Sequence, residues 1–298
     1  PTEKIKKNKI YKLVDHLLQI DNYWMKVCAI TGSTGVLGEK ALKMLPFKFL
    51  KFKGKIENYN VIKNWISKNN FDLLIHFAAK VPTKEVDLNF KKALQINHLG
   101  TKNLVKALKY KNQKPDWVFF ASTSHVYKLN KKKIKTSENE KLIPSSKYGL
   151  TKKFAEKEIF KLKKTKIKFC IGRIFSFTDK NQKKPFFIPS IINKLKKNKS
   201  RNITFQNLNH YRDFISTKSI IKVIFRLYKT KSTGVFNIGS GQNINLKDIV
   251  LLIGKKYNKN ITFVDNKSPT YLISDNRKIL KKKIKIKYFR NNLNFFYN

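Results

Sequence analysis

Two side chains that could move a proton, Tyr148 and Lys152, lie four residues apart in the segment Tyr-Gly-Leu-Thr-Lys. The segment 148–160 is predicted to be helical, so both side chains would face the same way. An ammonium ion beside a phenol favours the phenolate and lowers its pKa from the usual value of about 10. Tyr148 could then donate or accept a proton near neutral pH.

The spacing Tyr-x-x-x-Lys carries little information by itself, because 66 of the residues are Lys or Arg. Its position is more informative. A predicted strand, 117–121, precedes it and ends in Ser122-Thr123-Ser124, whose hydroxyls would project from the carboxyl edge of a sheet. Thr123 could hydrogen-bond a substrate oxygen and help to orient Tyr148.

A glycine-rich turn follows the predicted strand 26–30 and opens a predicted helix, 36–45. This context favours a phosphate-binding turn over an ordinary one. Gly32 allows a tight turn, Gly35 leaves room for a pyrophosphate beside the backbone, and Gly38 lets the helix pack on the strand. The helix N-terminus would add free N–H groups. We therefore predict a dinucleotide cofactor held by Gly32, Ser33, Thr34, Gly35, Val36, Leu37 and Gly38.

Short apolar runs alternate with amphipathic segments along the chain. Strands are predicted at 26–30, 47–52, 72–78, 117–121, 167–174 and 234–238. Helices are predicted at 36–45, around 61–66, and at 91–108, 148–160, 188–195, 217–228 and 246–257. This alternation predicts an α/β fold, a Rossmann-like doubly wound parallel sheet with helices on both faces. A smaller C-terminal substrate-binding lobe should face the carboxyl edge of the sheet.

We divide the chain into an extension, a nucleotide-binding domain and a lobe. The NAD(P)-binding Rossmann domain takes 25–174, and 214–238 should return to it. The substrate-binding lobe and a basic tail take 175–213 and 239–298, and 281–298 should be partly disordered. Met25 would open directly on the first strand, so we expect that residues 1–24 are an appendage and that deleting them leaves activity intact.

The formal net charge of +48 suggests a nucleic-acid binder at first sight. Only six of the 66 basic residues are Arg, whereas nucleic-acid interfaces favour Arg for bidentate contacts. The lysines are spread along the chain together with Asn, Ile and Phe, as A/T-rich codons would produce. We therefore favour codon bias over a nucleic-acid partner. The charge should still attract anionic substrates.

Several other classes of protein are disfavoured. No apolar run approaches the roughly 18 to 20 residues that span a bilayer, and the first 24 residues lack the apolar core of a secretory signal. Cys28 and Cys170 lie in apolar strand-like runs, so we expect core residues and no disulfide or metal pair. We predict a cytoplasmic, reduced protein with no membrane partner and no metal.

The motifs in their order resemble those of the extended short-chain dehydrogenase/reductase family, in its NAD(P)-dependent nucleotide-sugar epimerase/dehydratase/reductase branch. The resemblance covers about 25 to 280, and the ordered spacing is specific. The matching pieces are Thr-Gly-Ser-Thr-Gly-Val-Leu-Gly at 31–38, His-Phe-Ala-Ala at 76–79, Asn97, Ala-Ser-Thr-Ser-His-Val-Tyr at 121–127, Tyr-Gly-Leu-Thr-Lys at 148–152, Gly-Arg-Ile-Phe at 172–175, Arg-Asp-Phe-Ile at 212–215 and Phe-Asn-Ile-Gly-Ser-Gly at 236–241.

The resemblance implies a role for each matching residue. Tyr148 would be the catalytic acid/base, Thr123 the catalytic hydroxyl, and Lys152 would bind the nicotinamide ribose while lowering the Tyr148 pKa. Further cofactor contacts would come from Phe77, Ala78, Ala79 and Asn97. Substrate contacts would come from Lys80, Thr123, Ser124, His125, Ser176 and Arg212. Arg212 would reach the substrate diphosphate, which suits a forked cation.

The chain departs from the family pattern at several positions. Ser124-His125 stands where the 4,6-dehydratases carry Asp-Glu, which argues against dehydration. Ser176 stands where the family often has Asn. His125 could be an additional acid/base, but we favour a hydrogen-bonded loop histidine.

The stretch 38–76 is short, as in dTDP-4-dehydrorhamnose reductase and related 4-keto-sugar reductases. Glu57-Asn58 takes the place of their Asp before the next helix and would contact the cofactor. Strand 47–52 has no acidic residue at its end to bind a ribose 2′-hydroxyl, and lysines cluster there at 51, 53 and 55. This slightly favours NADP over NAD.

The leading hypothesis is reduction of a 4-keto sugar nucleotide by NADPH or NADH, with Tyr148 donating the proton. A nucleotide-sugar 4-epimerase with bound NAD is the first alternative. A non-catalytic RNA-binding or regulatory relative, motivated by the charge, is the second. The chain could act as a homodimer.

Overall fold

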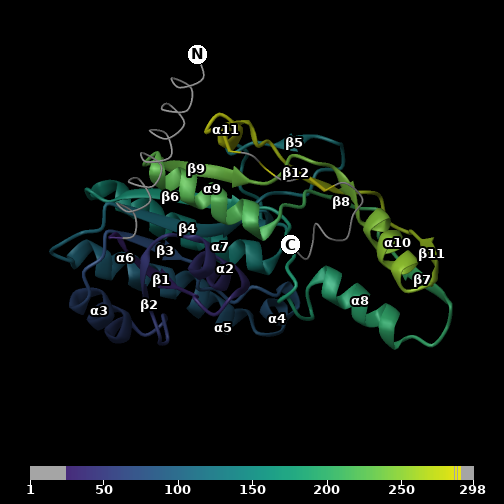
Figure 1. The fold of residues 1–298 in the computed structure, drawn as a ribbon, viewed down its shortest axis with the longest axis horizontal. Coiled ribbons are helices and arrows are strands. Elements are labelled where there is room, and N and C mark those ends of the chain that lie inside the picture. The colour runs from purple at the N-terminus through teal and green to yellow at the C-terminus, as the bar shows by residue number, and fades with distance from the viewer. Residues whose placement is uncertain (1–24, 285, 287, 290–298) are drawn as a thin grey trace, which may run out of the picture.

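The central feature of the computed structural model, which describes residues 25–284, 286, 288 and 289, is a six-stranded parallel sheet (Figure 1). The extension 1–24 and the remaining tail residues lie outside the described residues. The strand order is β2-β1-β3-β4-β6-β9. Their bounds are Val27–Thr31 (β1), Lys48–Lys51 (β2), Leu73–His76 (β3), Trp117–Thr123 (β4), Lys168–Ile174 (β6) and Gly234–Ile238 (β9).

Helices cover both faces of this sheet. Every residue of β3 and β4 is buried, as the continuous apolar runs of a parallel sheet require. One face packs against Val36–Met44 (α2), Thr217–Lys229 (α9) and Arg277–Leu280 (α11). The other packs against Tyr59–Lys68 (α3), Gly100–Tyr110 (α6), Lys147–Phe160 (α7) and Lys161–Lys164 (η3). The predicted doubly wound α/β fold is confirmed.

The strand order reverses at β1, which pairs with β2 on one side and with β3 on the other. Ligands of such sheets bind in the crevice outside the carboxyl ends of the strands at this point. The glycine turn follows β1 directly, and the segments after β3 and β4 begin at the same edge. The topology therefore brings together three parts of the chain that the sequence singled out.

The second lobe lies beyond one end of the sheet, where Figure 1 shows α8, α10, β7 and β11 grouped together. Its elements are Phe187–Lys197 (α8), Asn202–Gln206 (β7), Tyr211–Arg212 (β8), Ile244–Asn245 (β10), Leu246–Lys256 (α10), Asn260–Val264 (β11) and Tyr271–Ser274 (β12). A four-stranded sheet runs β10-β8-β12-β5, and β11 pairs with β7. Strand β5, Lys135–Thr136, comes from inside the range 25–174, so that range also contributes to the second sheet.

The C-terminal part divides between the two regions. Ile279, Ile284 and Ile286 are buried in the same core as β1 and β9, so this stretch packs on the central sheet and not in the lobe. Phe289 lies in the core of the lobe, and its backbone exchanges hydrogen bonds with the Gln242 side chain. These apolar side chains therefore have cores to enter, and most of the tail for which partial disorder was expected lies outside the described residues.

The helices before β4 differ from the prediction. The helix expected at 91–108 consists of Phe90–Leu94 (α5), a π-helical turn Gln95–Leu99 (η1) and α6. An unpredicted helix, Thr83–Leu88 (α4), precedes it. Among the described residues, no helix combines the length and the apolar character that crossing a bilayer requires.

Candidate active site

The glycine turn packs very closely against its surroundings. Gly32 has a φ of +72°, and a Cβ there would lie 2.5 Å from the backbone nitrogen of Ala78. A Cβ on Gly38 would lie 2.7 Å from Cα of Ser33. A Cβ on Gly35 would meet nothing nearer than 3.5 Å. Gly32 and Gly38 are thus required by the fold itself, whereas the space beside Gly35 is open.

Helix α2 begins at this turn with its N–H groups available. Gly35 is the N-cap residue and provides no side-chain hydrogen bond to the first turn. Thr34, Gly35, Val36, Leu37 and Gly38 line a cavity of about 930 Å³ together with Gly32. Ser33 is buried and is not part of this lining. An uncapped N-terminus facing a cavity is suited to bind an anion such as a phosphate.

The segment after β3 forms the next wall of the cavity with Phe77, Ala78, Ala79 and Lys80. Asn97, on the π-helical turn, fixes this wall because its side chain accepts from the Lys80 backbone N–H (2.7 Å) and donates to the Lys80 carbonyl (2.9 Å). Asn97 also donates to the Thr151 hydroxyl on α7 (2.9 Å). It is 1% exposed and does not line the cavity, so its place is behind the wall.

His76, at the end of β3, connects this strand to β1 beneath the wall through a side-chain hydrogen bond. Its Nδ1 lies 2.6 Å from the Thr31 hydroxyl, and its Nε2 lies 3.0 Å from the Thr101 hydroxyl. The Thr101 hydroxyl donates to the Asn97 carbonyl, so Nε2 of His76 donates to Thr101 and Nδ1 accepts from Thr31. Complete burial lowers the pKa of His76 to about 3, and the ring is neutral at physiological pH.

The proposed catalytic groups meet where β4 ends and α7 begins. The hydroxyls of Thr123 and Tyr148 are hydrogen-bonded, and both side chains line the cavity. Lys152 lies one helical turn further along α7, with Nζ 4.1 Å from the centre of the Phe120 ring. The three groups that the sequence singled out therefore share one cavity wall with the glycine turn.

Burial dominates the ionisation of this group. It raises the pKa of the Tyr148 phenol well above its ordinary value, and the hydrogen bond from Thr123 offsets only part of this. Burial also lowers the pKa of the Lys152 ammonium to about 7. The expectation that Lys152 lowers the pKa of Tyr148 is not met in this structure, because both groups have lost the water that would stabilise their charged forms.

Ser124 and His125, in the 3-10 turn Ser124–Val126 (η2), continue the wall beyond Thr123. The Ser146 hydroxyl accepts from the Gly149 N–H (3.0 Å) and is hydrogen-bonded to Nδ1 of His125 (3.0 Å). Burial lowers the pKa of His125 to about 4, with a further contribution from the Arg212 charge. A neutral, hydrogen-bonded ring matches the loop histidine that the sequence favoured over an additional acid/base.

Gly149, which the sequence prediction did not single out, sets the approach of α7 to this turn. A Cβ at this position would lie 2.0 Å from the carbonyl oxygen of His125. The glycine directly after Tyr148, in the first turn of a helix, was the available signal. Without it, Tyr148 could not come close to Thr123.

Arg212 and Ser176 line the far side of the cavity, toward the lobe. The guanidinium is held by the Tyr211 carbonyl (2.8 Å) and by the Thr270 carbonyl (3.0 Å) and hydroxyl (3.1 Å). Burial lowers the Arg212 pKa to about 10, so it is still charged at neutral pH. A cation fixed in this way can meet an anionic group of a ligand without reorganising.

Gln182 also lines the cavity, and no sequence signal marked it. It is 8% exposed, and its Oε1 atom has no hydrogen-bond partner. Neighbouring residues hold its segment against two helices, since Asp179 accepts from the Thr217 hydroxyl on α9 (2.7 Å) and Asn181 donates to Glu39 on α2 (3.3 Å). A buried acceptor without a donor, facing a cavity, suits a donor on a bound ligand.

Glu57 and Asn58 do not line the cavity. Asn58 caps α3 by accepting from the N–H groups of Asn60 and Val61, and Glu57 forms an ion pair with Lys92 at 2.8 Å. These contacts give both residues structural roles, and their proposed contact with the cofactor stays a prediction.

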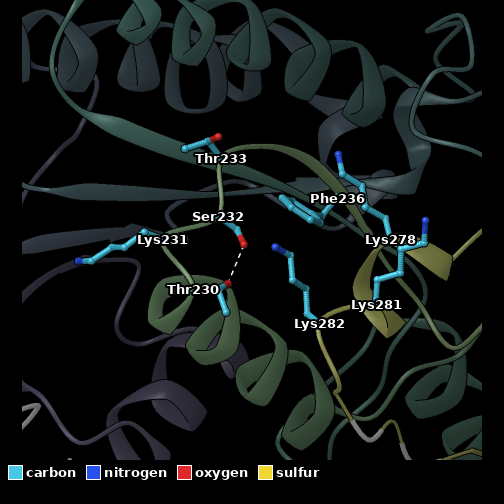
Figure 2. Close-up of a pocket in the computed structure, with 8 residues that line it drawn as sticks. All are labelled: Thr230, Lys231, Ser232, Thr233, Phe236, Lys278, Lys281 and Lys282. Carbon is cyan, nitrogen blue, oxygen red and sulfur yellow. Dashed lines mark hydrogen bonds between the residues drawn. The ribbon is translucent and has the colours of Figure 1, made fainter.

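A separate hollow of about 510 Å³ lies between the end of α9 and α11, lined by Thr230, Lys231, Ser232, Thr233, Phe236, Lys278, Lys281 and Lys282. Figure 2 shows Lys231 and Lys281 extending away from Ser232 in different directions. Lys278 donates to the Val235 carbonyl (2.5 Å). Because these ammonium groups do not converge, the hollow is not built to bind an anion.

Comparisons with known proteins find relatives over most of this chain. A dTDP-D-glucose 4,6-dehydratase from Dictyostelium discoideum is 31% identical over 224 residues, which cover 70% of this chain and 50% of that relative. A GDP-6-deoxy-D-talose 4-dehydrogenase from Aggregatibacter actinomycetemcomitans is 25% identical over 268 residues, which cover 84% of this chain and 89% of that relative. The chain thus spans about half the length of the Dictyostelium relative.

Solved structures share the fold. The structure of RMD from Pseudomonas aeruginosa complexed with NADPH superposes with a TM-score of 0.78 at 19% identity, covering 89% of this chain and 95% of that one. A dTDP-4-dehydrorhamnose reductase from Clostridium acetobutylicum gives 0.73 at 20% identity, covering 86% and 91%. The family model described as GDP-mannose 4,6 dehydratase matches residues 25–294. The chain therefore belongs to this family, whose relatives include sugar-nucleotide dehydratases, reductases and epimerases.

Proposed function

We propose that the chain is an NAD(P)-dependent oxidoreductase that reduces the 4-keto group of a nucleotide-activated sugar. The observation that carries the proposal is the Thr123–Tyr148 hydrogen bond beside Lys152, in the same cavity as the glycine turn. A dTDP-4-dehydro-6-deoxyglucose reductase from Escherichia coli, 28% identical over 218 residues, supports the reaction class.

The cavity fits a nicotinamide dinucleotide. The open space beside Gly35 and the uncapped start of α2 suit a pyrophosphate, and the buried Oε1 of Gln182 suits an amide or hydroxyl donor. Neighbours of similar fold were solved with NADPH or NAD. Two exposed lysines, Lys51 at the end of β2 and Lys53 after it, favour NADP. When bound, the dinucleotide would supply the hydride.

Each protein group then has a defined task. Thr123 and Tyr148 would hold the keto oxygen between their hydroxyls. Tyr148 would donate its proton to that oxygen as negative charge develops, and burial keeps the phenol protonated until then. Lys152 would hold the ribose and stabilise the resulting phenolate. Arg212 would hold the diphosphate at the other end of the cavity.

Reduction is favoured over dehydration by the residues after Thr123. The dehydratases carry Asp-Glu at this place, whereas Ser124 has no ionisable group and His125 is neutral and bonded to Ser146. The pair therefore lacks the carboxyl groups that would remove and return protons on the sugar.

The test is a screen of 4-keto sugar nucleotides with NADPH and with NADH, followed by the absorbance of the reduced cofactor. Tyr148→Phe should lower turnover by about 100-fold or more while cofactor still binds. Tyr110→Phe, on the 73% exposed Tyr110, is the matched control and should retain full turnover. Normal turnover in Tyr148→Phe would exclude this mechanism.

A 4-epimerase with bound NAD is the second candidate, because the same residues can catalyse both oxidation and re-reduction. An ADP-L-glycero-D-manno-heptose-6-epimerase from Fusobacterium nucleatum, 26% identical over 208 residues, is among the relatives. An epimerase would interconvert its substrates with no net consumption of cofactor, whereas a reductase consumes one reduced cofactor per product.

Two further proposals concern the setting of the enzyme. Cys28 and Cys170 are buried free thiols, and burial raises the pKa of both, which is consistent with a cytoplasmic protein. We also propose a homodimer, which sedimentation would distinguish from a monomer.

A further inference from the structure

A buried carboxylate behind the catalytic wall, Glu156, forms an ion pair with the buried Arg173 and lies one helical turn from the buried Lys152. It follows Lys152 by four residues on α7, so the two side chains lie on the same side of the helix. Arg173 approaches from β6, next to β4 in the sheet. The exposed fractions of Lys152, Glu156 and Arg173 are 2%, 1% and 4%. Three charged groups are thus enclosed together.

Hydrogen bonds hold the Glu156 carboxylate in one orientation. Arg173 donates to it through Nε (3.0 Å) and Nη2 (2.8 Å). The hydroxyl of Ser122 donates to the same carboxylate (2.5 Å). Ser122 directly precedes Thr123 and is the partner of Arg173 across the two strands. Glu156 therefore connects α7, which carries Tyr148 and Lys152, to the end of the strand that carries Thr123.

The other ionisable groups around this trio are neutral or already engaged. His76, on β3, is neutral because burial lowers its pKa to about 3. The Tyr148 phenol is protonated for the reason given above. On the far side, Arg173 donates to the Tyr127 hydroxyl (2.8 Å) and to the backbone carbonyl of Glu138 (3.0 Å), and the Glu138 carboxylate accepts from the Asn237 N–H.

We propose that Glu156 is a positioning residue that keeps Lys152 in its ammonium form, and thereby sets the upper pH limit of the Tyr148 reaction. This deepens the proposed function and rests on it for the role of Lys152. Without Glu156, the two buried cations Lys152 and Arg173 would both lose the carboxylate that offsets their charge. Arg173 cannot lose its proton, so Lys152 would lose its own.

Two opposing effects leave the pKa of Lys152 close to neutral pH. Burial lowers the Lys152 pKa to about 7, and the charge of Glu156 opposes this shift. Glu156→Gln keeps the size and removes the charge, and it replaces one of the two acceptor oxygens by an NH2 donor. Glu158→Gln is the matched control, because Glu158 is on the same helix, is 7% exposed and pairs with Lys161 (2.7 Å) instead.

The direct test measures the ionisation of Lys152 without any substrate. Acetic anhydride labels unprotonated amines. Mass spectrometry of the Lys152 peptide across pH gives the labelling midpoint, which is the pH at which labelling of Lys152 is half-maximal. In Glu156→Gln this midpoint should fall by about one pH unit or more. In Glu158→Gln and Ser122→Ala it should stay at the wild-type value. A mere loosening of the structure would admit water and raise the midpoint instead.

A second variant covers the case in which Glu156→Gln does not fold. In Arg173→Met, Lys152 is the only cation of the trio that remains beside Glu156. The labelling midpoint of Lys152 should therefore rise above the wild-type value. An unchanged or raised midpoint in Glu156→Gln overturns the proposal, and so does an unchanged or lowered midpoint in Arg173→Met.

Activity gives an independent readout. The alkaline limb of the turnover profile should move to lower pH in Glu156→Gln by the same amount as the labelling midpoint. If the wild-type protein turns over no sugar nucleotide, the proposed function fails, whereas the labelling midpoint still decides whether Glu156 controls Lys152.

Discussion

Tyr148 has to release a proton from a position that water hardly reaches, since it is only 8% exposed. The spacing of Tyr148 and Lys152 correctly indicated a shared helix face. It could not reveal how far burial suppresses the charge of both groups, because desolvation depends on the strands and loops that enclose them. The phenol is therefore protonated and able to donate a proton, which is the state that reduction needs.

His76 predicts a pH dependence of stability. Its pKa is about 3 in the folded protein and 6.5 when unperturbed. Between these values the unfolded chain binds a proton that the folded chain does not, so the free energy of unfolding falls as the pH is lowered from 6.5. At pH 5 the loss should be about 2 kcal/mol relative to neutral pH.

Urea unfolding at pH 7 and at pH 5 checks this prediction. In His76→Gln, the free energy of unfolding should fall less between pH 7 and pH 5 than in the wild type, and the difference should be about 2 kcal/mol. His98→Gln, at a side chain that is 31% exposed, should keep the wild-type loss. Equal losses in the wild type and in His76→Gln would contradict the assignment.

At the scale of elements, two glycines of the turn between β1 and α2 should have different tasks. Gly38 should matter for stability, and Gly35 for cofactor binding. Gly38→Ala places a Cβ 2.7 Å from the Ser33 backbone and should destabilise the protein by about 1–3 kcal/mol. Gly35→Ala meets only ordinary contacts, so stability should change by less than about 1 kcal/mol. Cofactor affinity should nevertheless fall in Gly35→Ala, because the methyl group occupies the place of the pyrophosphate.

Thermal unfolding and titration of NADPH fluorescence measure the two effects separately. Gly35→Ala should retain the wild-type melting temperature and bind NADPH more weakly. Tight NADPH binding by this variant would place the pyrophosphate elsewhere.

Elements with a strong local pattern were predicted well, such as β4 and α7. The π-helical turn Gln95–Leu99 was not, because its residues continue the apolar spacing of the helices on either side. Its widened backbone places Asn97 against Lys80, a contact between residues 17 positions apart in the chain. Such a turn depends on what it packs against, and π-helical turns often occur at functional sites for that reason.

At the scale of the whole molecule, the sequence indicated both lobes but not which core each C-terminal residue joins. Ile279 and Ile284 pack with the central sheet, whereas Phe289 packs in the lobe. Apolar residues in a lysine-rich stretch show no periodicity, so only the three-dimensional neighbours decide their place. The candidate site was easier to predict than the packing of the C-terminal residues, because motifs after β1, β3 and β4 must meet at one edge of the sheet.

The net charge of +48 predicts that ionic strength controls substrate capture. A positive field attracts an anionic sugar nucleotide, and salt screens it over a Debye length of about 10 Å at 0.1 M. Raising the salt from about 50 to 300 mM should increase KM several-fold and leave kcat unchanged. Arg212→Met should raise KM at every salt concentration, whereas Arg201→Met, at an exposed residue, should not. A KM that is independent of salt would contradict this prediction.

The return of the chain to the central sheet has a consequence for its synthesis on the ribosome. Strand β9 completes the sheet beside β6, and Ile279, Ile284 and Ile286 then close the core that contains β1. A nascent chain that ends before Gly234 exposes the edge of β6 and one apolar face of the sheet. The core of the central sheet can therefore be completed only after the lobe has been translated. The two parts of the protein should finish folding together.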